Sequence, residues 1–322
     1  MSKKIIIITG DPISINSEII YKCWKKLNTK LKKKIYFISN YRLIEKQFNK
    51  LRYKTKILKL NNLNERSNSN KLKIIDINLD FRDPFKIKEK NSSIFVINAL
   101  NLAHKLALAN KDILGIINCP LNKNLLPNKK FGVTEYLASK CNVKKGFESM
   151  LIRNKKLSVC PISTHVNLRE VPKKLKTSLI INKAKTIDYW FKKTFKRKPK
   201  IAILGLNPHN AEYRKNSEEK KIIIPAILKI NKLKINAKGP FVADTIFIKD
   251  YKNFDVIMGM YHDQVLAPFK SIFKFDAINI TLGLKYLRLS PDHGVAVDLI
   301  GKNKANPKSL YECINFISKY KG

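Results

Sequence analysis

The chain has 322 residues, 44% of them apolar, and a formal net charge of +41 at pH 7, so it is long enough to bury a sizeable core in two lobes or one large α/β unit. Its unbroken apolar runs, such as residues 5–8, are much shorter than the roughly 20 residues that cross a bilayer, and its N-terminus shows no secretory signal pattern, so we expect a soluble, cytoplasmic protein without membrane contact. The 65 basic residues would normally indicate a nucleic-acid partner, but they are spread along the whole chain without a recognisable binding module, and we interpret them as a compositional bias on solvated positions.

Strand-like runs alternate with helix-like segments along the chain, which predicts an α/β fold with a mainly parallel sheet. We expect one lobe to combine residues 1–126 with 277–322 and a second lobe to comprise residues 127–276. The Asn- and Ser-rich residues 61–70 read as an exposed loop. In chain order, the predicted elements are a strand at 4–9, a helix at 17–31, a strand at 35–39, a helix at 43–51, strands at 55–60 and 73–78, a helix at 94–109, a strand at 113–118, a helix at 134–140, strands at 150–152 and 157–162, a helix at 179–195 and a strand at 201–206.

The cysteines are five in number and widely scattered, with no Cys-x-x-Cys pair. Neither a disulfide framework nor a thiolate zinc site is therefore predicted, and we expect free, mostly buried thiols. Cys119 could alternatively be read as a nucleophile, but no histidine lies near it in the sequence, and burial is the more common fate of a free cysteine.

Histidine is rare, and four of the five histidines are predicted to lie in loops at the ends of strand-like runs, whereas His104 lies inside the predicted helix at 94–109 and reads as structural. Three of the four, His165, His209 and His262, directly follow such runs. Ligands of open α/β sheets gather beyond the carboxyl ends of the strands, where three imidazoles could bind one divalent ion such as zinc. The alternative for each is a hydrogen-bonded loop histidine, since no short local spacing links the three.

Several motifs occur in order along almost the whole chain. They are Gly205-Leu206-Asn207-Pro208-His209, Ala243-Asp244-Thr245, Tyr261-His262-Asp263-Gln264 and Asn279-Ile280-Thr281-Leu282-Gly283, followed by Arg288 and Asp292-His293-Gly294. Together they resemble the 4-hydroxythreonine-4-phosphate dehydrogenase family. The resemblance implies an isocitrate/isopropylmalate-dehydrogenase-like fold, in which two α/β lobes share a central mixed, mainly parallel sheet and the active site lies in the cleft between them.

The resemblance also implies roles for particular residues. His165, His209 and His262 would be catalytic metal ligands, with zinc the preferred ion and magnesium or cobalt the alternatives. One ligand would come from the partner chain of a homodimer that shares its active sites, with dimer contacts in the second lobe. The residues implied to contact a small phosphorylated substrate are Thr134, Lys270, Asn279 and Arg288, of which Lys270 would also be catalytic.

The coenzyme segment is inferred partly from an absence. No Gly-x-Gly-x-x-Gly occurs in the sequence, so the ordinary Rossmann fingerprint is missing. Residues 292–302, running on to 305–307, are instead similar to the segment with which decarboxylating dehydrogenases hold the adenosine part of NAD. The alternative is a glycine-containing loop that leads into a C-terminal helix. The resemblance implies NAD or NADP as coenzyme, bound by Asp292, His293, Gly294, Asp298 and Asn306.

The chain departs from the family pattern at three places. Val133 replaces the histidine of a Gly-His-Thr-Glu motif, which removes one polar substrate contact. The first loop keeps Gly10-Asp11-Pro12 and Glu18, but residues 13–17 replace a glycine-rich run. Cys119 replaces a glycine before Pro120, although Lys123 is kept. Missing glycines restrict the backbone and the close approach of a ligand, so these changes bear on substrate choice or catalytic efficiency.

The resemblance thus implies an NAD-dependent oxidation of 4-phosphooxy-L-threonine with decarboxylation to 3-amino-2-oxopropyl phosphate, in pyridoxal phosphate biosynthesis. A related phosphorylated hydroxy acid without the amine, such as 4-phosphothreonate, is the alternative that Val133 would permit. A basic nucleic-acid-binding protein on a degenerate enzyme scaffold is the alternative from another class, and it would show tight, steeply salt-dependent DNA binding.

Overall fold

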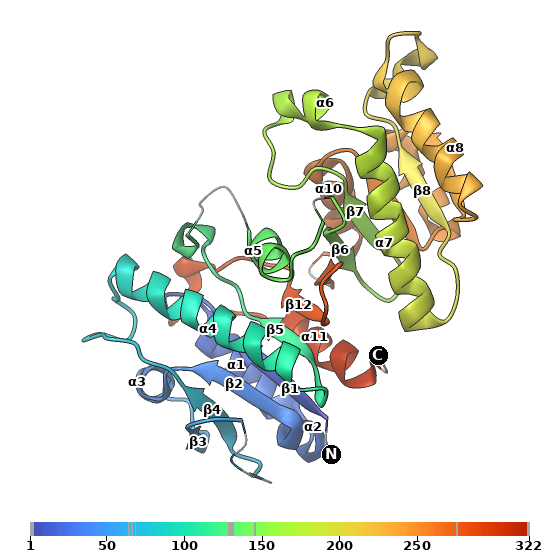
Figure 1. Cartoon of the computed structure of the whole chain (residues 1–322). Coiled ribbons are helices and arrows are strands. Elements are labelled where there is room, and N and C mark those ends of the chain that lie inside the picture. The colour runs from blue at the N-terminus through green and yellow to red at the C-terminus, as the bar shows by residue number, and fades with distance from the viewer. Residues whose placement is uncertain are drawn as a thin grey trace. The chain divides into compact units, whose positions relative to one another are not determined.

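The computed structural model of the chain describes residues 3–63, 65, 67, 69–127, 132–144, 146–274 and 276–320. They fold into two compact units (Figure 1): unit 1 comprises Met1–Val133 and Lys285–Tyr320, and unit 2 begins at Thr134 and runs to Leu284. These boundaries fall a few residues beyond the expected ones at 126 and 277. The strand at Ile278–Leu282 therefore belongs to unit 2, because it pairs with the strand at Ser149–Arg153.

Unit 1 contains a sheet of six strands in the order β3-β4-β2-β1-β5-β12. Every neighbouring pair in it is parallel. The central strand β1 holds four consecutive isoleucines that are almost fully buried, and burying each one stabilises the fold by roughly 1.5–3 kcal/mol. The strands of unit 1 are β1 (Lys4–Ile8), β2 (Ile35–Ser39), β3 (Ile57–Leu60), β4 (Leu72–Asp76), β5 (Ile113–Asn118) and β12 (Arg288–Pro291).

Helices cover both faces of this sheet. In Figure 1, α4 crosses one face, while α1 and α11 lie on the other. Gly115 in β5 allows the backbone before β12 to approach, because a Cβ at that position would lie 2.4 Å from the carbonyl oxygen of Leu287. The helices of unit 1 are α1 (Asn16–Lys26), α2 (Thr29–Lys34), α3 (Tyr41–Lys50), α4 (Glu89–Ala109) and α11 (Lys308–Lys319), with short helical turns η1 (Lys123–Leu125) and η6 (Val297–Leu299).

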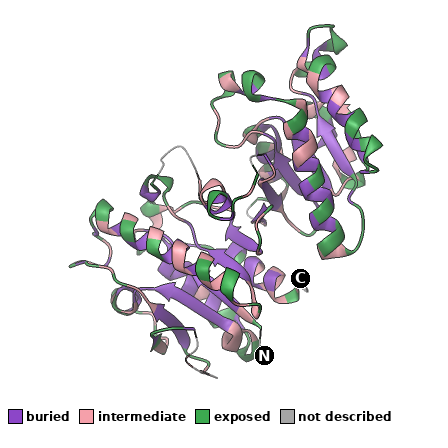
Figure 2. Ribbon diagram, in the orientation of Figure 1, coloured by how far each residue is buried: buried purple, intermediate pink, exposed green. Residues whose placement is uncertain are grey.

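Helix α4 is, among the described residues, the one helix long and apolar enough to cross a membrane, with a mean hydropathy of 1.3. One of its faces, which includes Phe95, Val96 and Leu100, is buried, and the helix packs on β1, β2 and β5. Figure 2 shows this alternation of buried and exposed residues along the helix. Such burial is typical of the core helix of an α/β unit.

Unit 2 contains a mixed sheet in the order β11-β6-β7-β10-β8-β9. Strand β6 pairs antiparallel with both of its neighbours, whereas β7, β10, β8 and β9 are parallel. This confirms the predicted mixed, mainly parallel α/β architecture. The strands of unit 2 are β6 (Ser149–Arg153), β7 (Ser158–Pro161), β8 (Ile201–Leu204), β9 (Ala237–Phe241), β10 (Val256–Gly259) and β11 (Ile278–Leu282).

The core of unit 2 lies where α10 packs on β7 and β10. Val265 and Phe269 of α10 are fully buried there, in one cluster with Val159 and Ile257 of the strands. The helices of this unit are α5 (Val133–Lys140), α6 (Val171–Lys174), α7 (Thr177–Phe195), α8 (Ile224–Lys232), α9 (Ala243–Ile246) and α10 (His262–Phe273), with turns η2 (Leu168–Glu170), η3 (Pro208–Tyr213), η4 (Glu219–Ile223) and η5 (Asp250–Asn253).

Some elements differ from those predicted. The helix expected at 17–31 is broken into α1 and α2, because Leu27 is extended and the Asn28 side chain accepts a hydrogen bond from the backbone N–H of Leu31 at the start of α2. The helix expected from 94 begins at Glu89. Helix α8 and strand β9 were not predicted, because lysines interrupt their apolar pattern.

Candidate active site

The three candidate ligand histidines follow three adjacent strands. His165 follows β7, His262 follows β10 and His209 follows β8, and the sheet order is β7-β10-β8. Because these strands are parallel, their carboxyl ends meet at one edge of the sheet, as the sequence predicted. The rings of His165 and His262 have centroids 6.0 Å apart. Backbone bonds link their segments, with Ile162 N–H donating to Gly259 O at 2.7 Å.

His262 is the first residue of α10, so the prediction that it lies in a loop is wrong. The strand ends at Gly259, Tyr261 is extended, and the helix starts immediately afterwards. Nδ1 of His262 lies 2.6 Å from Oδ1 of Asp263. A carboxylate can only accept, so this contact assigns the proton to Nδ1 and leaves Nε2 as the nitrogen for a ligand.

His209 occupies an uncommon backbone conformation. It begins a run of five non-glycine residues with left-handed φ angles of 50°, 56°, 52°, 44° and 54°, from His209 to Tyr213. Asn210 anchors the run by donating to the carbonyl oxygen of Pro240 at 3.0 Å. A Cβ on Gly205 would lie 2.0 Å from Oδ1 of Asn210, so a larger residue there would displace the Asn210 side chain.

Two further side chains, Gln264 and Glu219, for which the sequence predicted no role, hold the ends of these strands in place. Gln264 accepts from the Met260 N–H at 2.6 Å and donates to the carbonyl oxygen of Gly205 at 2.7 Å, so it joins the His262 segment to the His209 segment. Glu219 is fully buried and accepts from the N–H groups of Leu206 and Asn207.

Hydrogen bonding also determines the charge of Glu219. Burial by itself would raise the pKa of this carboxyl, but hydrogen bonds from Asn207 and from the Leu206 N–H outweigh it and lower the pKa. Glu219 is therefore an ionised acceptor at neutral pH. Gln264 belongs to the motif at residues 261–264, so its position in the sequence could have indicated a functional role. Glu219 lies outside the quoted motifs, and no local sequence pattern indicated its role.

The histidines are not all brought together within one chain. Among the described residues, no three His, Cys, Asp or Glu side chains form a group that could hold a metal ion. His165 and His262 lie near each other, and His209 does not complete a group with them. The donor chemistry, neutral imidazole nitrogen, nevertheless suits zinc or a similar ion.

Three of the predicted substrate residues belong to unit 2. Thr134 in α5 is buried, and its Oγ1 lies 3.1 Å from Oγ1 of Thr281 in β11. Asn279, also in β11, has a buried Oδ1 without a hydrogen-bond partner in the described part of the chain. Lys270 is half-buried in the last turn of α10. An unsatisfied buried amide oxygen is costly unless a ligand pairs with it, so Asn279 fits a binding role.

Arg288, the fourth predicted substrate residue, begins β12 in unit 1. Its side chain is buried, and Nε donates to Oδ1 of Asn118 at 2.6 Å. Asn118 ends β5, which pairs with β12. Asn118 therefore orients the guanidinium of Arg288, a role that was not predicted from the sequence.

The predicted coenzyme segment lies between β12 and α11. The Asp292 N–H donates to Oγ of Ser309, and Nδ1 of His293 lies 3.0 Å from the Gly294 carbonyl oxygen. A Cβ built on Gly294 or Gly301 would meet no atom within 4 Å. The backbone of this segment thus borders open space, as a nucleotide-binding loop requires.

The remaining predicted coenzyme residues lie along the same segment. Asp298 is exposed in the helical turn η6. Asn306 is exposed and accepts from the Lys308 N–H at the start of α11. An exposed carboxylate and a side chain at a helix start are both accessible to a nucleotide.

The altered first loop is held by its own side chains. Asp11 is buried and accepts from the N–H groups of Ile13 and Asn122, and burial raises its pKa in spite of these bonds. Asn16 donates to the Pro120 carbonyl oxygen at 2.7 Å. These polar side chains fix the loop against residues 120–122 without the glycines usual in the family.

All five cysteines are free and buried, as predicted. Burial raises the pKa of the Cys119 thiol well above its usual value. A thiol in that state carries almost no thiolate at neutral pH, so the nucleophile reading of Cys119 is wrong.

Imidazoles beyond the carboxyl ends of parallel strands, and a glycine-containing segment that borders open space, are typical of α/β enzymes that bind a ligand at this edge of the sheet. A model of the family described as pyridoxal phosphate biosynthetic protein PdxA matches residues 30–317. The chain belongs to this family, which confirms the resemblance seen in its motifs.

Individual relatives agree with this assignment. The chain is 35% identical over 325 residues to 4-hydroxythreonine-4-phosphate dehydrogenase of Sulfurihydrogenibium sp. (strain YO3AOP1), across 97% of this chain and 96% of that one. The crystal structure of 4-hydroxythreonine-4-phosphate dehydrogenase from Klebsiella pneumoniae is similar, with a TM-score of 0.84, 26% identity, and coverage of 98% of this chain and 99% of that one.

A further relative bears on substrate choice. The chain is 35% identical over 222 residues, 67% of this chain and 66% of the relative, to a protein of Oceanobacillus iheyensis (strain DSM 14371 / CIP 107618 / JCM 11309 / KCTC 3954 / HTE831) for which D-threonate 4-phosphate dehydrogenase activity has been proposed.

Proposed function

We propose that the chain is a 4-hydroxythreonine-4-phosphate dehydrogenase, which oxidises 4-phosphooxy-L-threonine with NAD or NADP and releases carbon dioxide and 3-amino-2-oxopropyl phosphate in pyridoxal phosphate biosynthesis. The observation that carries the proposal is the placement of His165, His209 and His262 after three adjacent parallel strands, in a chain of the PdxA family. Membership in a family of dehydrogenases implies the use of a nicotinamide coenzyme.

The reaction needs charge neutralisation at two points. The C3 hydroxyl loses its proton and its carbon loses a hydride to the nicotinamide, which gives a β-keto acid. The carboxylate then leaves as carbon dioxide, its bonding electrons pass to C2, and a proton returns to C2. A divalent metal, zinc by preference, with magnesium and cobalt as alternatives, would supply Lewis acidity when held by the three histidines, one of them from a second chain.

The other residues have roles in substrate binding and charge stabilisation. Lys270 and Arg288 would neutralise the phosphate and carboxylate, and arginine offers a bidentate fork for either anion. Asn118 would orient Arg288 for this contact, because its Oδ1 accepts a hydrogen bond from Nε of the guanidinium at 2.6 Å. Thr134 and Asn279 would contribute hydrogen bonds to the substrate.

The test is an assay of purified protein with 4-phosphooxy-L-threonine, each coenzyme and each of zinc, magnesium and cobalt. Formation of reduced coenzyme is expected, with loss of activity on chelation and recovery with one of the metals. No reduced coenzyme with any combination would overturn the proposal.

A second candidate substrate is 4-phosphothreonate, favoured by Val133 in place of the usual histidine and by the named activity of one relative. Val133 is half-buried at the start of α5, next to Thr134. We expect Val133→His to raise the ratio of kcat/KM for the amino acid substrate over 4-phosphothreonate. Equal ratios in the two proteins would exclude Val133 as a determinant of specificity.

Nucleic-acid binding is the competing function of another class, suggested by the net charge of +41. An enzyme with scattered solvated lysines should bind nonspecific DNA weakly at roughly 0.15 M salt. Tight binding there, with a steep salt dependence, would support the nucleic-acid alternative. We also expect the enzyme to be cytoplasmic and homodimeric.

A further inference from the structure

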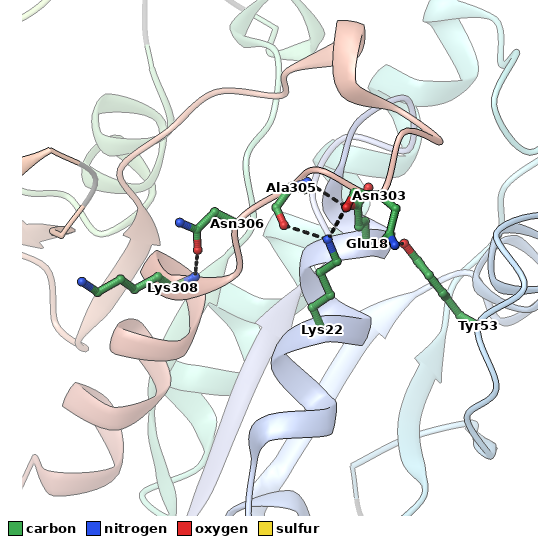
Figure 3. A network of polar contacts seen from close by, with 7 residues as sticks. All are labelled: Glu18, Lys22, Tyr53, Asn303, Ala305, Asn306 and Lys308. Carbon is green, nitrogen blue, oxygen red and sulfur yellow. Dashed lines mark hydrogen bonds and ion pairs between the residues drawn. The ribbon is translucent and has the colours of Figure 1, made fainter.

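A buried carboxylate on α1 contacts the far end of the predicted coenzyme segment. The Glu18 side chain is 1% exposed, and its Oε1 accepts from Nζ of Lys22 and from the backbone N–H of Ala305, both at 2.7 Å. Lys22 donates in turn to the carbonyl oxygens of Asn303 and Ala305, at 2.9 and 3.1 Å. Figure 3 shows the two side chains reaching from the helix to this loop. One ion pair thus binds three backbone groups of residues 303–305.

This ion pair differs from an ordinary pair on a helix surface. Exposed ion pairs between residues four apart on a helix contribute only about 0.3–0.5 kcal/mol to stability. The carboxylate of Glu18 is instead buried, and its Oε2 has no hydrogen-bond partner among the described residues. Taking a carboxylate out of water is expensive, so a buried pair is weak grounds for inferring stability. A role in fixing the position of residues 303–305 explains the buried Glu18–Lys22 pair better than a contribution to stability does.

A tyrosine holds the same loop from another side. The Tyr53 hydroxyl donates to Oδ1 of Asn303 at 3.2 Å, and its ring stacks on Tyr21 of α1 with centroids 4.1 Å apart. Burial, together with the charge of Glu18, raises the pKa of Tyr53 to about 12, so the hydroxyl stays a donor at neutral pH. Asn303 itself has a left-handed φ of 54°, a conformation that needs such anchors.

The segment is also fixed at an earlier point. The Ile15 N–H, just before α1, donates to the Val295 carbonyl oxygen at 3.1 Å. The start of α1 and its second turn therefore hold the two ends of residues 295–305. Between them lies Gly301, with the open space beside it.

We propose that Glu18 and Lys22 are positioning residues for the nicotinamide coenzyme, which hold the backbone of residues 303–305 in the conformation that binds the adenosine end. The inference rests on the proposed function, which assigns residues 292–306 to the coenzyme. Glu18 and Lys22 act through the loop and need not touch the coenzyme.

The test combines coenzyme affinity with loop dynamics in Lys22→Met and Glu18→Gln, using Lys25→Met as a control that removes an exposed lysine from the same helix. Calorimetry with NAD⁺ and NADP⁺ gives Kd, and hydrogen exchange of the coenzyme-free protein reports the Ala305 amide. In Lys22→Met we expect Kd for the coenzyme to rise about tenfold, the effect of losing charged hydrogen bonds, with faster exchange at Ala305. The KM for the phosphorylated substrate and kcat at saturating coenzyme should stay unchanged, and Lys22→Arg should restore Kd.

The outcomes separate the inference from the function on which it rests. Faster exchange with an unchanged Kd would show that the pair is merely structural, and unchanged exchange would show that it does not hold the loop, so either result overturns the inference. A wild-type protein that binds neither coenzyme would overturn the coenzyme assignment itself, and the inference with it. If Glu18→Gln does not fold, the coenzyme Kd and the Ala305 exchange rate of Lys22→Met and Lys22→Arg still test the inference.

Discussion

Lys73 in β4 is a fully buried lysine. Its Nζ donates to the Lys33 carbonyl oxygen and lies 4.0 Å from the centroid of the Tyr36 ring. Burial, with a contribution from the charge of Lys4, lowers its pKa from 10.5 to about 8. Below pH 8 the folded state therefore holds a buried charge at a cost, and between pH 8 and 10.5 it binds fewer protons than the unfolded state, so its stability rises with pH.

Lys73→Met should consequently raise the free energy of unfolding at pH 7 by about 2 kcal/mol. The pKa shift corresponds to roughly 3 kcal/mol, and loss of the bond to Lys33 offsets about 1 kcal/mol. The gain should disappear by about pH 10. Urea unfolding at pH 7 and at about pH 10 measures the change in the free energy of unfolding, and Lys71→Met, which removes an exposed lysine from a neighbouring position, is the control. If the free energy of unfolding of the two variants depended on pH in the same way, the burial cost assigned to Lys73 would be wrong.

At the scale of single elements, the turn η3 stores backbone strain beside His209. Each left-handed non-glycine residue costs roughly 1–2 kcal/mol. Glu212, with φ 44°, is exposed, and within the described part of the chain its side chain makes one long ion pair, of 3.6 Å to Arg214. Glycine removes this strain but loses about 0.5–1 kcal/mol more conformational freedom on folding. Glu212→Gly should therefore raise the free energy of unfolding by a net of about 0.5–1 kcal/mol, whereas Glu212→Ala should not. Thermal unfolding of the two variants checks this, and equal midpoints would refute the argument from strain.

Gln264 joins the strand ends that carry two of the candidate ligands. Gln264→Met keeps the approximate volume but removes both hydrogen bonds to the Met260 and Gly205 backbone. We expect the affinity for zinc to fall about tenfold, as is common when a residue that orients metal ligands is lost. Metal titration measures this. Gln47→Met, at a buried glutamine that donates to Pro12 and Pro84, should destabilise the protein while leaving zinc affinity unchanged.

At the scale of the whole molecule, the proposed metal site needs two chains. If one of the three ligands comes from the partner, mixing inactive His165→Asn, His209→Asn and His262→Asn proteins in pairs should restore roughly a quarter of wild-type activity in two of the three mixtures, because half of the molecules are heterodimers with one intact site. The ligand common to both active mixtures is the one contributed by the partner.

Two controls accompany the mixing experiment. Each variant alone must be inactive and dimeric, and the mixtures must be unfolded and refolded together so that chains exchange. Inactivity of all three mixtures would contradict a shared site and would mean that one chain supplies all three ligands.

The amino-acid sequence by itself determined the class of the fold, most strands, the burial of the cysteines and the family, because these depend on local apolar periodicity and on short motifs in a fixed order. Runs such as Ile5–Ile8 can be read directly as a buried strand. The three histidines were found in the same way, since each follows such a run, and His209 and His262 also belong to motifs.

The tertiary structure alone decided which side chains support these residues. Gln264 meets Gly205 across 59 residues, Arg288 meets Asn118 across 170, and Glu18 meets Ala305 across 287. Local periodicity carries no information about such pairs, because a hydrogen bond between distant segments depends on the order of strands in the sheet. The same holds for the left-handed turn at His209, whose strain is offset by contacts such as that of Asn210 with Pro240.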